Sequence, residues 1–131
     1  MDVKNAFLQG ELEEEVYMVQ PPSFNLTTNP KVVCQLKRPL YGLKQAPRAW
    51  HSKITQYLHQ IGFRYIRSGS ESPIVIILYV DDVVIGDEHL VEINKVKSLL
   101  SDKFEMTYMK ELHYFLGIEV IRTPAGIMIS R

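Results

Sequence analysis

The strongest indication of the fold is the stretch IVIILYVDDVVIG, which spans residues 74–86. Residues 74–80 form a continuous apolar run rich in β-branched side chains, which is typical of a strand buried on both faces. Asp81 and Asp82 interrupt this run, and Val83 resumes it. The pattern predicts a β-hairpin whose two-residue tip is the aspartate pair.

A helix is predicted on each side of this hairpin. After Pro47, which suits a first helical position, apolar residues recur at helical spacing for about 15 residues, and Gly62 is placed to end the helix. This first stripe comprises Trp50, Ile54, Tyr57, Leu58 and Ile61. A second helix is expected from about Glu88 to Lys103. Its stripe comprises Leu90, Ile93, Val96 and Leu100.

The C-terminal part of the chain adds further strands. A strand is expected over residues 114–121, and residues 127–129 are expected to return beside it after the Pro-Ala-Gly turn at 124–126. Strands and helices intermix without repeats, so the sequence predicts one α+β domain of 131 residues. We expect a mainly antiparallel sheet packed on two helices.

The composition indicates a globular chain, with 46% hydrophobic, 10% aromatic and 23% charged residues. The single cysteine, Cys34, excludes an internal disulfide framework and suits a reducing compartment. Residues 74–80 are the longest apolar run, far short of the ~20 residues of a membrane helix. Since nothing resembles a signal peptide either, we expect a soluble intracellular protein without a membrane partner.

Charge is sorted along the chain although it balances overall, with 15 Lys and Arg against 15 Asp and Glu. No acidic residue occurs between Val16 and Ser70, a stretch that carries eight Lys or Arg. Such asymmetry indicates a surface that faces a polyanion. Eight cations in that length are also an ordinary density, so plain surface lysines and arginines remain the alternative.

The aspartate pair carries the clearest chemical signal. Adjacent carboxylates between apolar strands are costly unless water, a basic partner or a metal ion neutralises them. A plain solvent-exposed turn is the alternative, but the apolar flanks and the absence of glycine in so tight a turn argue against it. A divalent site would need another carboxylate from elsewhere in the chain, and oxygen ligands favour Mg²⁺ or Mn²⁺.

Four motifs carry a family resemblance. The sequence YVDD at 79–82 resembles the Y-x-D-D box of reverse transcriptases, and residues 1–18 resemble the opening palm motif of copia-type retrotransposons. Residues 40–50, LYGLKQAPRAW, are similar to the next block of that family, and FLGIEV at 115–120 resembles its primer-grip segment. The chain is identified as a member of the copia-type (Ty1/copia) LTR-retrotransposon reverse transcriptases, covering the palm region of a Pol polyprotein.

The resemblance implies a catalytic set of Asp2, Asp81 and Asp82. In the family, the positions of Asp2 and Asp81 hold two Mg²⁺ ions, which Mn²⁺ can replace, and Asp82 matches a supporting charge. This set implies RNA-directed DNA polymerisation by two-metal nucleotidyl transfer.

Further residues match nucleotide- or template-binding positions of the family. Phe7 corresponds to an aromatic ring beneath the incoming sugar, although an ordinary core phenylalanine is the alternative. Gly42 would let the backbone approach the templating base, and Lys44 and Arg48 would contact phosphates. Tyr79 belongs to the Y-x-D-D box itself.

Other positions carry different implications. Phe115, Leu116 and Gly117 would form the turn that positions the primer end. Tyr41 falls where other reverse transcriptases have glutamine, which makes Gln45 a less secure nucleotide contact. The histidines and Cys34 show no zinc spacing and are interpreted as structural or surface residues.

The chain departs from the family pattern in three places. Asp2 stands directly after Met1, whereas relatives have a fingers region upstream. Chain ends fray at such a position, and the free amine competes with a metal ion. The segment between Arg67 and Tyr79 is shorter than in relatives, and the sequence stops before any thumb or RNase H region. We therefore expect a partial palm that polymerises poorly or not at all alone. A longer polyprotein would supply the fingers, thumb and RNase H regions around an RNA or DNA template-primer and dNTPs.

Three alternatives remain open. The chain could be a catalytically idle nucleic-acid-binding or interaction remnant of a retrotransposon, which has no use for the aspartates. A palm-like nucleotidyl cyclase also pairs strand carboxylates, but residues 40–48 and 115–120 would have no role in it. A decayed gene fragment would lack a cooperative unfolding transition.

Overall fold

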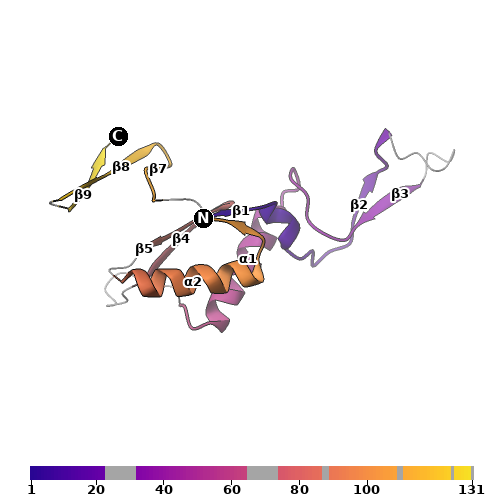
Figure 1. Ribbon diagram of the computed structural model, residues 1–131. Helices are drawn as coiled ribbons and strands as arrows, with labels where there is room; N and C mark the ends of the chain where they lie inside the picture. Colours follow the sequence, from indigo (N-terminus) through magenta and orange to yellow (C-terminus); the bar gives the residue numbers. More distant parts are fainter. Residues whose placement is uncertain (23–31, 65–73, 87–88, 109–110, 125, 131) are drawn as a thin grey trace. The chain divides into compact units, whose positions relative to one another are not determined.

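A computed structural model describes most of the chain (Figure 1). The described residues are 1–22, 32–64, 74–86, 89–108, 111–124 and 126–130. The chain divides into two compact units, one formed by Met1–Lys4 with Ser72–Arg131 and the other by Asn5–Glu71. The described residues include two α-helices and several antiparallel strand pairs, which confirms the α+β class.

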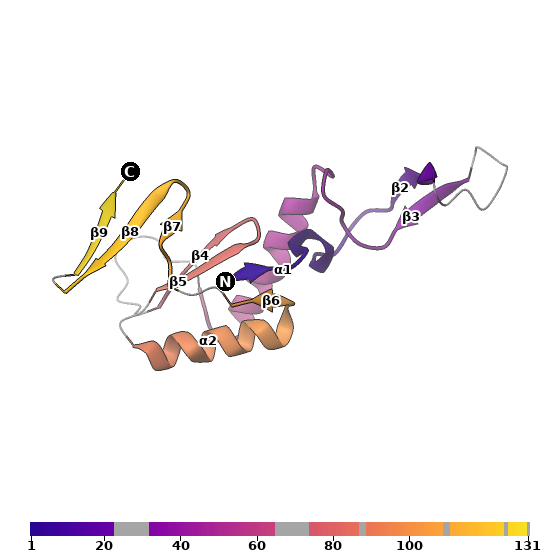
Figure 2. The ribbon, with the colours of Figure 1, turned by 45° about the horizontal axis from the view of Figure 1, so that its top comes forward.

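The first unit is built on a four-stranded antiparallel sheet with the order β4-β5-β1-β6. Its strands are β4 (Val75–Tyr79), β5 (Asp82–Gly86), β1 (Asp2–Val3) and β6 (Met106–Thr107). β4 and β5 form the hairpin predicted from residues 74–86, and β1 pairs between β5 and β6. Helix α2 (Leu90–Lys103) contacts β6 and lies alongside the sheet in both Figure 1 and Figure 2.

Strand β4 is not buried on both faces, so that prediction is wrong. Val75, Ile77 and Tyr79 are about half exposed, at 47–49% each, and they alternate with less exposed neighbours. β4 is the edge strand of an antiparallel sheet, and such a sheet can keep one face open to solvent. A continuous apolar run therefore does not by itself indicate burial on both sides.

The second predicted helix begins later than expected. α2 starts at Leu90, and residues 87–88 lie outside the described part of the chain. Leu90 was expected in the buried stripe but is 75% exposed, because the buried residues of α2 lie in the half of the helix nearer β6. The core of this unit comprises Val3, Val83, Val96, Leu100 and Phe104.

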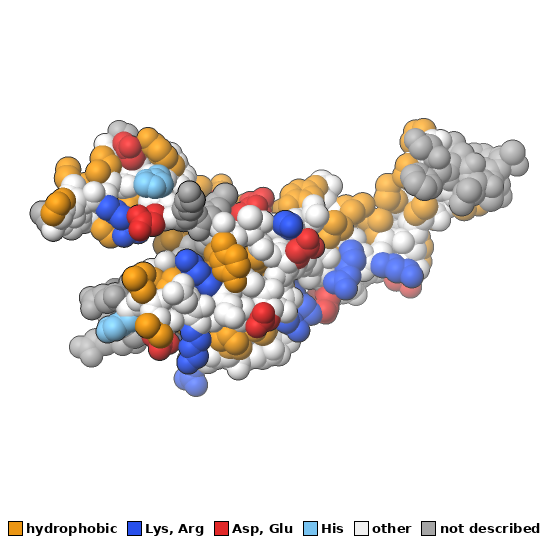
Figure 3. All heavy atoms as spheres, viewed as in Figure 1, with side chains coloured by type: hydrophobic (Ala, Val, Ile, Leu, Met, Phe, Trp, Pro, Cys, Tyr) orange, Lys and Arg blue, Asp and Glu red, His pale blue; other side chains and the backbone are white. Residues whose placement is uncertain are grey.

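A second sheet in the same unit contains β7 (Tyr114–Phe115), β8 (Ile118–Thr123) and β9 (Gly126–Ser130). The single strand expected over 114–121 is thus two strands, separated by the turn Leu116–Gly117. The expected return of residues 127–129 beside β8 is confirmed. Figure 3 shows hydrophobic side chains on the surface of this sheet. The exposed ones are Tyr114, Leu116, Ile121, Ile127, Met128 and Ile129.

The second unit contains η1 (Ala6–Gln9), the hairpin of β2 (Val16–Val19) and β3 (Val33–Leu36), and α1 (Ala46–Gln60). Helix α1 packs against η1. Its buried residues Trp50, Ile54 and Leu58 recur every fourth position, which confirms the predicted helix.

Gly10 explains how closely α1 approaches the end of η1. A Cβ atom at Gly10 would lie 3.0 Å from the Trp50 amide nitrogen and 3.1 Å from the Ala49 carbonyl carbon. Both atoms belong to backbone that cannot rotate away. The glycine is therefore required by packing within this unit.

Within the described parts of the chain, no helix is long and apolar enough to cross a bilayer.

Candidate active site

The β4–β5 hairpin turns at Val80 and Asp81. Tyr79 pairs with Asp82 across the turn, so Asp82 is the first residue of β5. The predicted tip, Asp81–Asp82, is therefore wrong by one residue. The reason lies in the backbone: Val80 has a φ of 52°, which closes the two-residue turn one position earlier than the residue types indicate.

Val80 holds a strained conformation. A β-branched side chain with positive φ is an outlier, and such residues cost about 1–3 kcal/mol each. The surrounding structure must therefore hold the turn in place. One such restraint is visible, because the carbonyl oxygen of Asp81 accepts a hydrogen bond of 2.8 Å from the amide of Val3 in β1.

Strand β1 brings Asp2 directly opposite Asp82. The neighbouring pair, Met1 and Val83, exchanges hydrogen bonds of 2.8 Å in both directions. Asp2 and Asp82 therefore form the non-hydrogen-bonded pair, in which the Cα atoms approach to about 4.5 Å and the side chains share one face. Met1 makes ladder hydrogen bonds in this structure, and the expected fraying at this end of the chain stays a prediction.

The electrostatics of this face reflect the crowding of carboxylates. Partial burial raises the pKa of Asp82 above its ordinary value, and the charges of Asp81 and then Asp2 raise it further. The positive charge of the Met1 amine lowers the pKa of Asp82, but the pKa remains raised overall. The face therefore favours any cation that can neutralise two or three carboxylates.

The structure offers two paired carboxylates and not a complete metal cluster. Among the described residues, no group of three or more His, Cys, Asp or Glu side chains could hold a metal ion. Asp2 and Asp82 offer two carboxylates, and Mg²⁺ is usually bound by one or two carboxylates together with substrate phosphates. The assignment of Asp2 and Asp81 as the metal ligands stays a prediction. The backbone pairing itself brings Asp82, and not Asp81, opposite Asp2.

The raised pKa of Asp82 predicts a pH-dependent stability. Between the ordinary pKa and the raised one, the folded state binds more protons than the unfolded state, so unfolding becomes easier as pH rises through this window. We expect the stability of Asp82→Asn relative to the wild type to increase as the pH rises from the ordinary pKa of an aspartate through the raised pKa of Asp82. Thermal melts across this range measure the difference. Asp102→Asn, an exposed site on α2, is the control, and a difference that shrinks with rising pH would contradict the prediction.

The predicted primer-grip residues lie at the β7–β8 turn of the same unit. Leu116 and Gly117 have φ values of 52° and 77°, as a type I′ hairpin turn requires, and Leu116 is 57% exposed at its tip. Phe115 meets Tyr79 of β4, with ring centroids 6.3 Å apart and ring planes at 83°. The structure thus brings the Y-x-D-D tyrosine and the primer-grip segment together.

The other predicted site residues belong to the second unit. Phe7 is only 7% exposed, and its ring lies 4.3 Å from that of Tyr41, centroid to centroid. Gly42 has a φ of 98°, which side chains other than glycine rarely adopt. Lys44 and Arg48 are exposed. The roles of these four residues toward nucleotide and template stay predictions.

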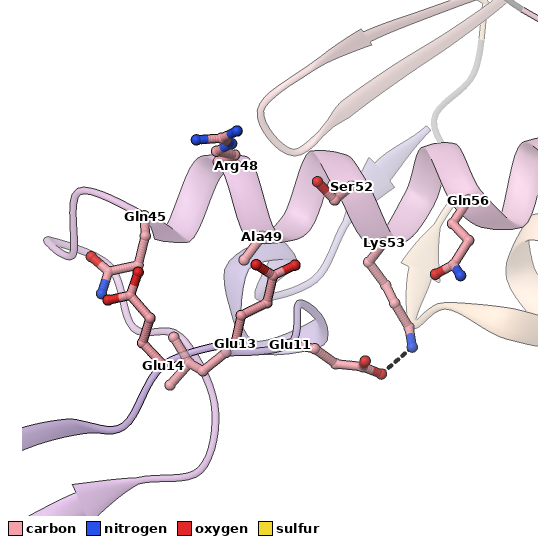
Figure 4. A pocket seen from close by; sticks show the side chains of 10 residues that line it. Glu11, Glu13, Glu14, Gln45, Arg48, Ala49, Ser52, Lys53 and Gln56 are labelled. Atoms are coloured by element: carbon pink, nitrogen blue, oxygen red, sulfur yellow. Dashed lines mark hydrogen bonds and ion pairs between the residues drawn. The ribbon is translucent and has the colours of Figure 1, made fainter.

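A polar pocket of about 350 Å³ also lies within the second unit (Figure 4). Glutamates 11, 13 and 14 line one side of it, and α1 supplies Arg48 and Lys53. Lys53 is ion-paired with Glu11, whereas the Arg48 guanidinium points away from the glutamates in Figure 4. The three aspartates do not contribute to this pocket.

Two features of the site were missed by sequence reasoning. The positive φ of Val80 left no signal, because valine is typical of strands. The contact between Tyr79 and Phe115 joins residues far apart in the chain. The only signal for it in the sequence is that both motifs contain an aromatic residue.

Comparison with known proteins gives a consistent result. Residues 1–131 match the family described as reverse transcriptase (RNA-dependent DNA polymerase). The whole chain is 42% identical to part of the retrovirus-related Pol polyprotein from transposon RE2 of Arabidopsis thaliana, over 139 aligned residues. It is 38% identical, over 93% of its length, to the corresponding polyprotein from transposon TNT 1-94 of Nicotiana tabacum.

A putative transposon Ty5-1 protein of Saccharomyces cerevisiae is 36% identical over 96% of the chain, which covers 44% of that relative. The chain spans only about a tenth of the two plant polyproteins, 10% of each. The match to the family nevertheless extends over every residue of the chain. The chain therefore belongs to the reverse transcriptase (RNA-dependent DNA polymerase) family, in the group of copia-type transposon Pol polyproteins.

Proposed function

We propose that the chain is the catalytic palm region of an RNA-directed DNA polymerase and that Asp2, Asp81 and Asp82 form its active site. One observation carries the proposal: backbone pairing sets Asp2 opposite Asp82 and ties the Asp81 carbonyl to β1. Three aspartates from two separate motifs thereby lie on neighbouring segments of the chain at one end of the hairpin, with Asp2 and Asp82 as cross-strand partners. The raised pKa of Asp82 supports the need for a neutralising cation there.

Each part of the site has a chemical task in this proposal. When bound, two Mg²⁺ ions supply the positive charge that stabilises the attacking 3′-oxygen and the leaving pyrophosphate. Asp2, together with Asp81 or Asp82, would hold these ions and thereby help to orient the triphosphate of a dNTP. The strained Val80–Asp81 turn fixes the carboxylates before the substrate arrives, so that less reorganisation is needed during the reaction.

Template and primer would be bound through phosphate contacts and the hairpin turns. Lys44 and Arg48 are exposed and available to the phosphates of a nucleic acid, and the Leu116–Gly117 turn would adjoin the primer end. The remaining contacts would come from other regions of a longer polyprotein, since the plant relatives are about ten times the length of the chain. For this reason we expect slow extension by the chain alone.

A primer-extension assay with Mg²⁺ or Mn²⁺ tests the proposal. We expect the chain to add nucleotides slowly to a primer annealed to RNA, and Asp81→Ala to lose this activity without losing nucleic-acid binding. Asp102→Ala, an exposed substitution on α2, is the matched control and should extend as the wild type does. Equal extension by Asp81→Ala and wild type would refute the proposed active site.

An idle nucleic-acid-binding remnant gives a different pattern in the same experiments. It would bind template-primer with an affinity that falls steeply with salt, because phosphate contacts release counterions. Its binding would not change when Mn²⁺ is added or when Asp81 is replaced, and no extension would occur. Binding titrations at several salt concentrations, with and without Mn²⁺, separate the two functions.

A further inference from the structure

The first unit contains two hairpin turns with the same unusual backbone feature. Val80 in the β4–β5 turn and Leu116 in the β7–β8 turn are both aliphatic residues with a φ of 52°. Turns of this kind usually place glycine, asparagine or aspartate at that position. Each turn therefore adopts a conformation that its own sequence disfavours, and contacts outside the turn must maintain it.

The residues that precede the two strained positions touch each other. Tyr79 comes directly before Val80, and Phe115 comes directly before Leu116. Their rings meet edge to face, with centroids 6.3 Å apart and an interplanar angle of 83°, which is a favoured geometry for an aromatic pair. The contact thus joins the first residues of two strained turns, although 36 positions separate them in the sequence.

The position of Tyr79 bears directly on the carboxylates. Tyr79 is the cross-strand partner of Asp82, and the turn that follows it presents the Asp81 carbonyl to the Val3 amide. Because the Tyr79 side chain is 49% exposed, burial in a core does not fix its orientation. A ring that packs against it from β7 restricts it instead.

We propose that Phe115 is a positioning residue for the catalytic turn. Its ring holds Tyr79, and through Tyr79 it keeps the Val80–Asp81 turn in the conformation that sets Asp81 and Asp82 beside Asp2. The catalytic role of Phe115 rests on the proposed function. The coupling of the two turns through Tyr79 and Phe115 does not depend on it. Phe115 thereby has a task separate from any contact with a primer.

Hydrogen exchange of single amides tests the coupling in the free chain. The Val3 amide donates to Asp81 and reports on the catalytic turn, whereas the Lys4 amide donates to Glu105 on the other side of β1. In Phe115→Leu and in Tyr79→Leu we expect the Val3 amide to exchange about fivefold faster. The Lys4 amide should keep its wild-type rate.

Two further variants distinguish positioning from general structural support. Tyr114→Leu makes the same kind of change on the neighbouring residue, which is 68% exposed and bonds through its hydroxyl to Glu119, and it should leave the Val3 amide unchanged. Phe115→Tyr retains an aromatic ring and should restore the wild-type rate. The double variant of Tyr79→Leu and Phe115→Leu should exchange no faster than either single variant.

Certain results would overturn the proposal. These are equal acceleration in Tyr114→Leu, equal acceleration of the Lys4 amide, or a double variant whose effect is the product of the two single effects. Mn²⁺ titration of the wild type and of Asp2→Asn reports separately on the proposed function. If Mn²⁺ does not bind while the Val3 amide responds as expected, the polymerase assignment fails and the coupling of the turns stands.

Discussion

Asp2→Asn is expected to weaken the binding of Mn²⁺ to the chain by about a hundredfold or more. The substitution removes one charge from the face that Asp2 shares with Asp82, but it leaves the backbone pairing of β1 intact. Two unit charges about 4 Å apart attract by about 4 kcal/mol at an effective dielectric constant of 20, and a divalent ion doubles the charge. Ion hydration offsets part of this attraction. Electron paramagnetic resonance of free Mn²⁺ measures the affinity.

The matched control for this experiment is Asp102→Asn. It makes the same chemical change at an exposed position on α2 and removes the same single negative charge. Its Mn²⁺ affinity should equal that of the wild type. Equal affinities for Asp2→Asn and Asp102→Asn would mean that Mn²⁺ binds through general charge and not at the paired carboxylates.

Leu100→Ala is expected to destabilise the first unit by about 2–5 kcal/mol. Leu100 is fully buried, with 0% of its surface exposed, and its truncation would leave a cavity beside the sheet that carries the aspartates. This loss is a large fraction of the total stability of a small domain, which is about 5–15 kcal/mol. Urea unfolding followed by far-ultraviolet circular dichroism gives the change in unfolding free energy.

Leu90→Ala makes the same substitution ten positions earlier on the same helix. Leu90 is 75% exposed, so its replacement should change the unfolding free energy by less than about 0.5 kcal/mol. If Leu90→Ala lowered the unfolding free energy as much as Leu100→Ala, the start of α2 would be buried, as the helical periodicity had indicated. The pair of variants therefore tests the corrected position of the buried stripe.

Sequence periodicity predicted the helices well and the exposure of the strands poorly. The stripe through Trp50, Ile54 and Leu58 fixed α1 because a helix buries every third or fourth residue in any fold of this kind. The burial of β4 could not be predicted in the same way, since its apolar run is compatible with a central or an edge strand. Strand order depends on contacts between distant segments, and one sequence does not display them.

The sequence predicted which residues form the candidate site better than it predicted how the backbone arranges them. The Y-x-D-D box and the opening motif supplied Asp2, Asp81 and Asp82. In the structure β1, which carries Asp2, pairs with the end of the β4–β5 hairpin that carries Asp81 and Asp82. The one-residue error at the turn arose because Val80 adopts a positive φ that its residue type disfavours. Local preferences are overridden at such a position by tertiary contacts, which the motif does not contain.

The pairing of Asp2 with Asp82 also limits which length changes this chain can accept. Side chains alternate along β1 and β5, with Asp2 and Asp82 on one face and the buried Val3 and Val83 on the other. Inserting or deleting a single residue that slips one of these strands by one position would exchange the two faces. One such event would carry a carboxylate into the core and a valine onto the face of the aspartates, so that folding and the proposed metal site would be lost together.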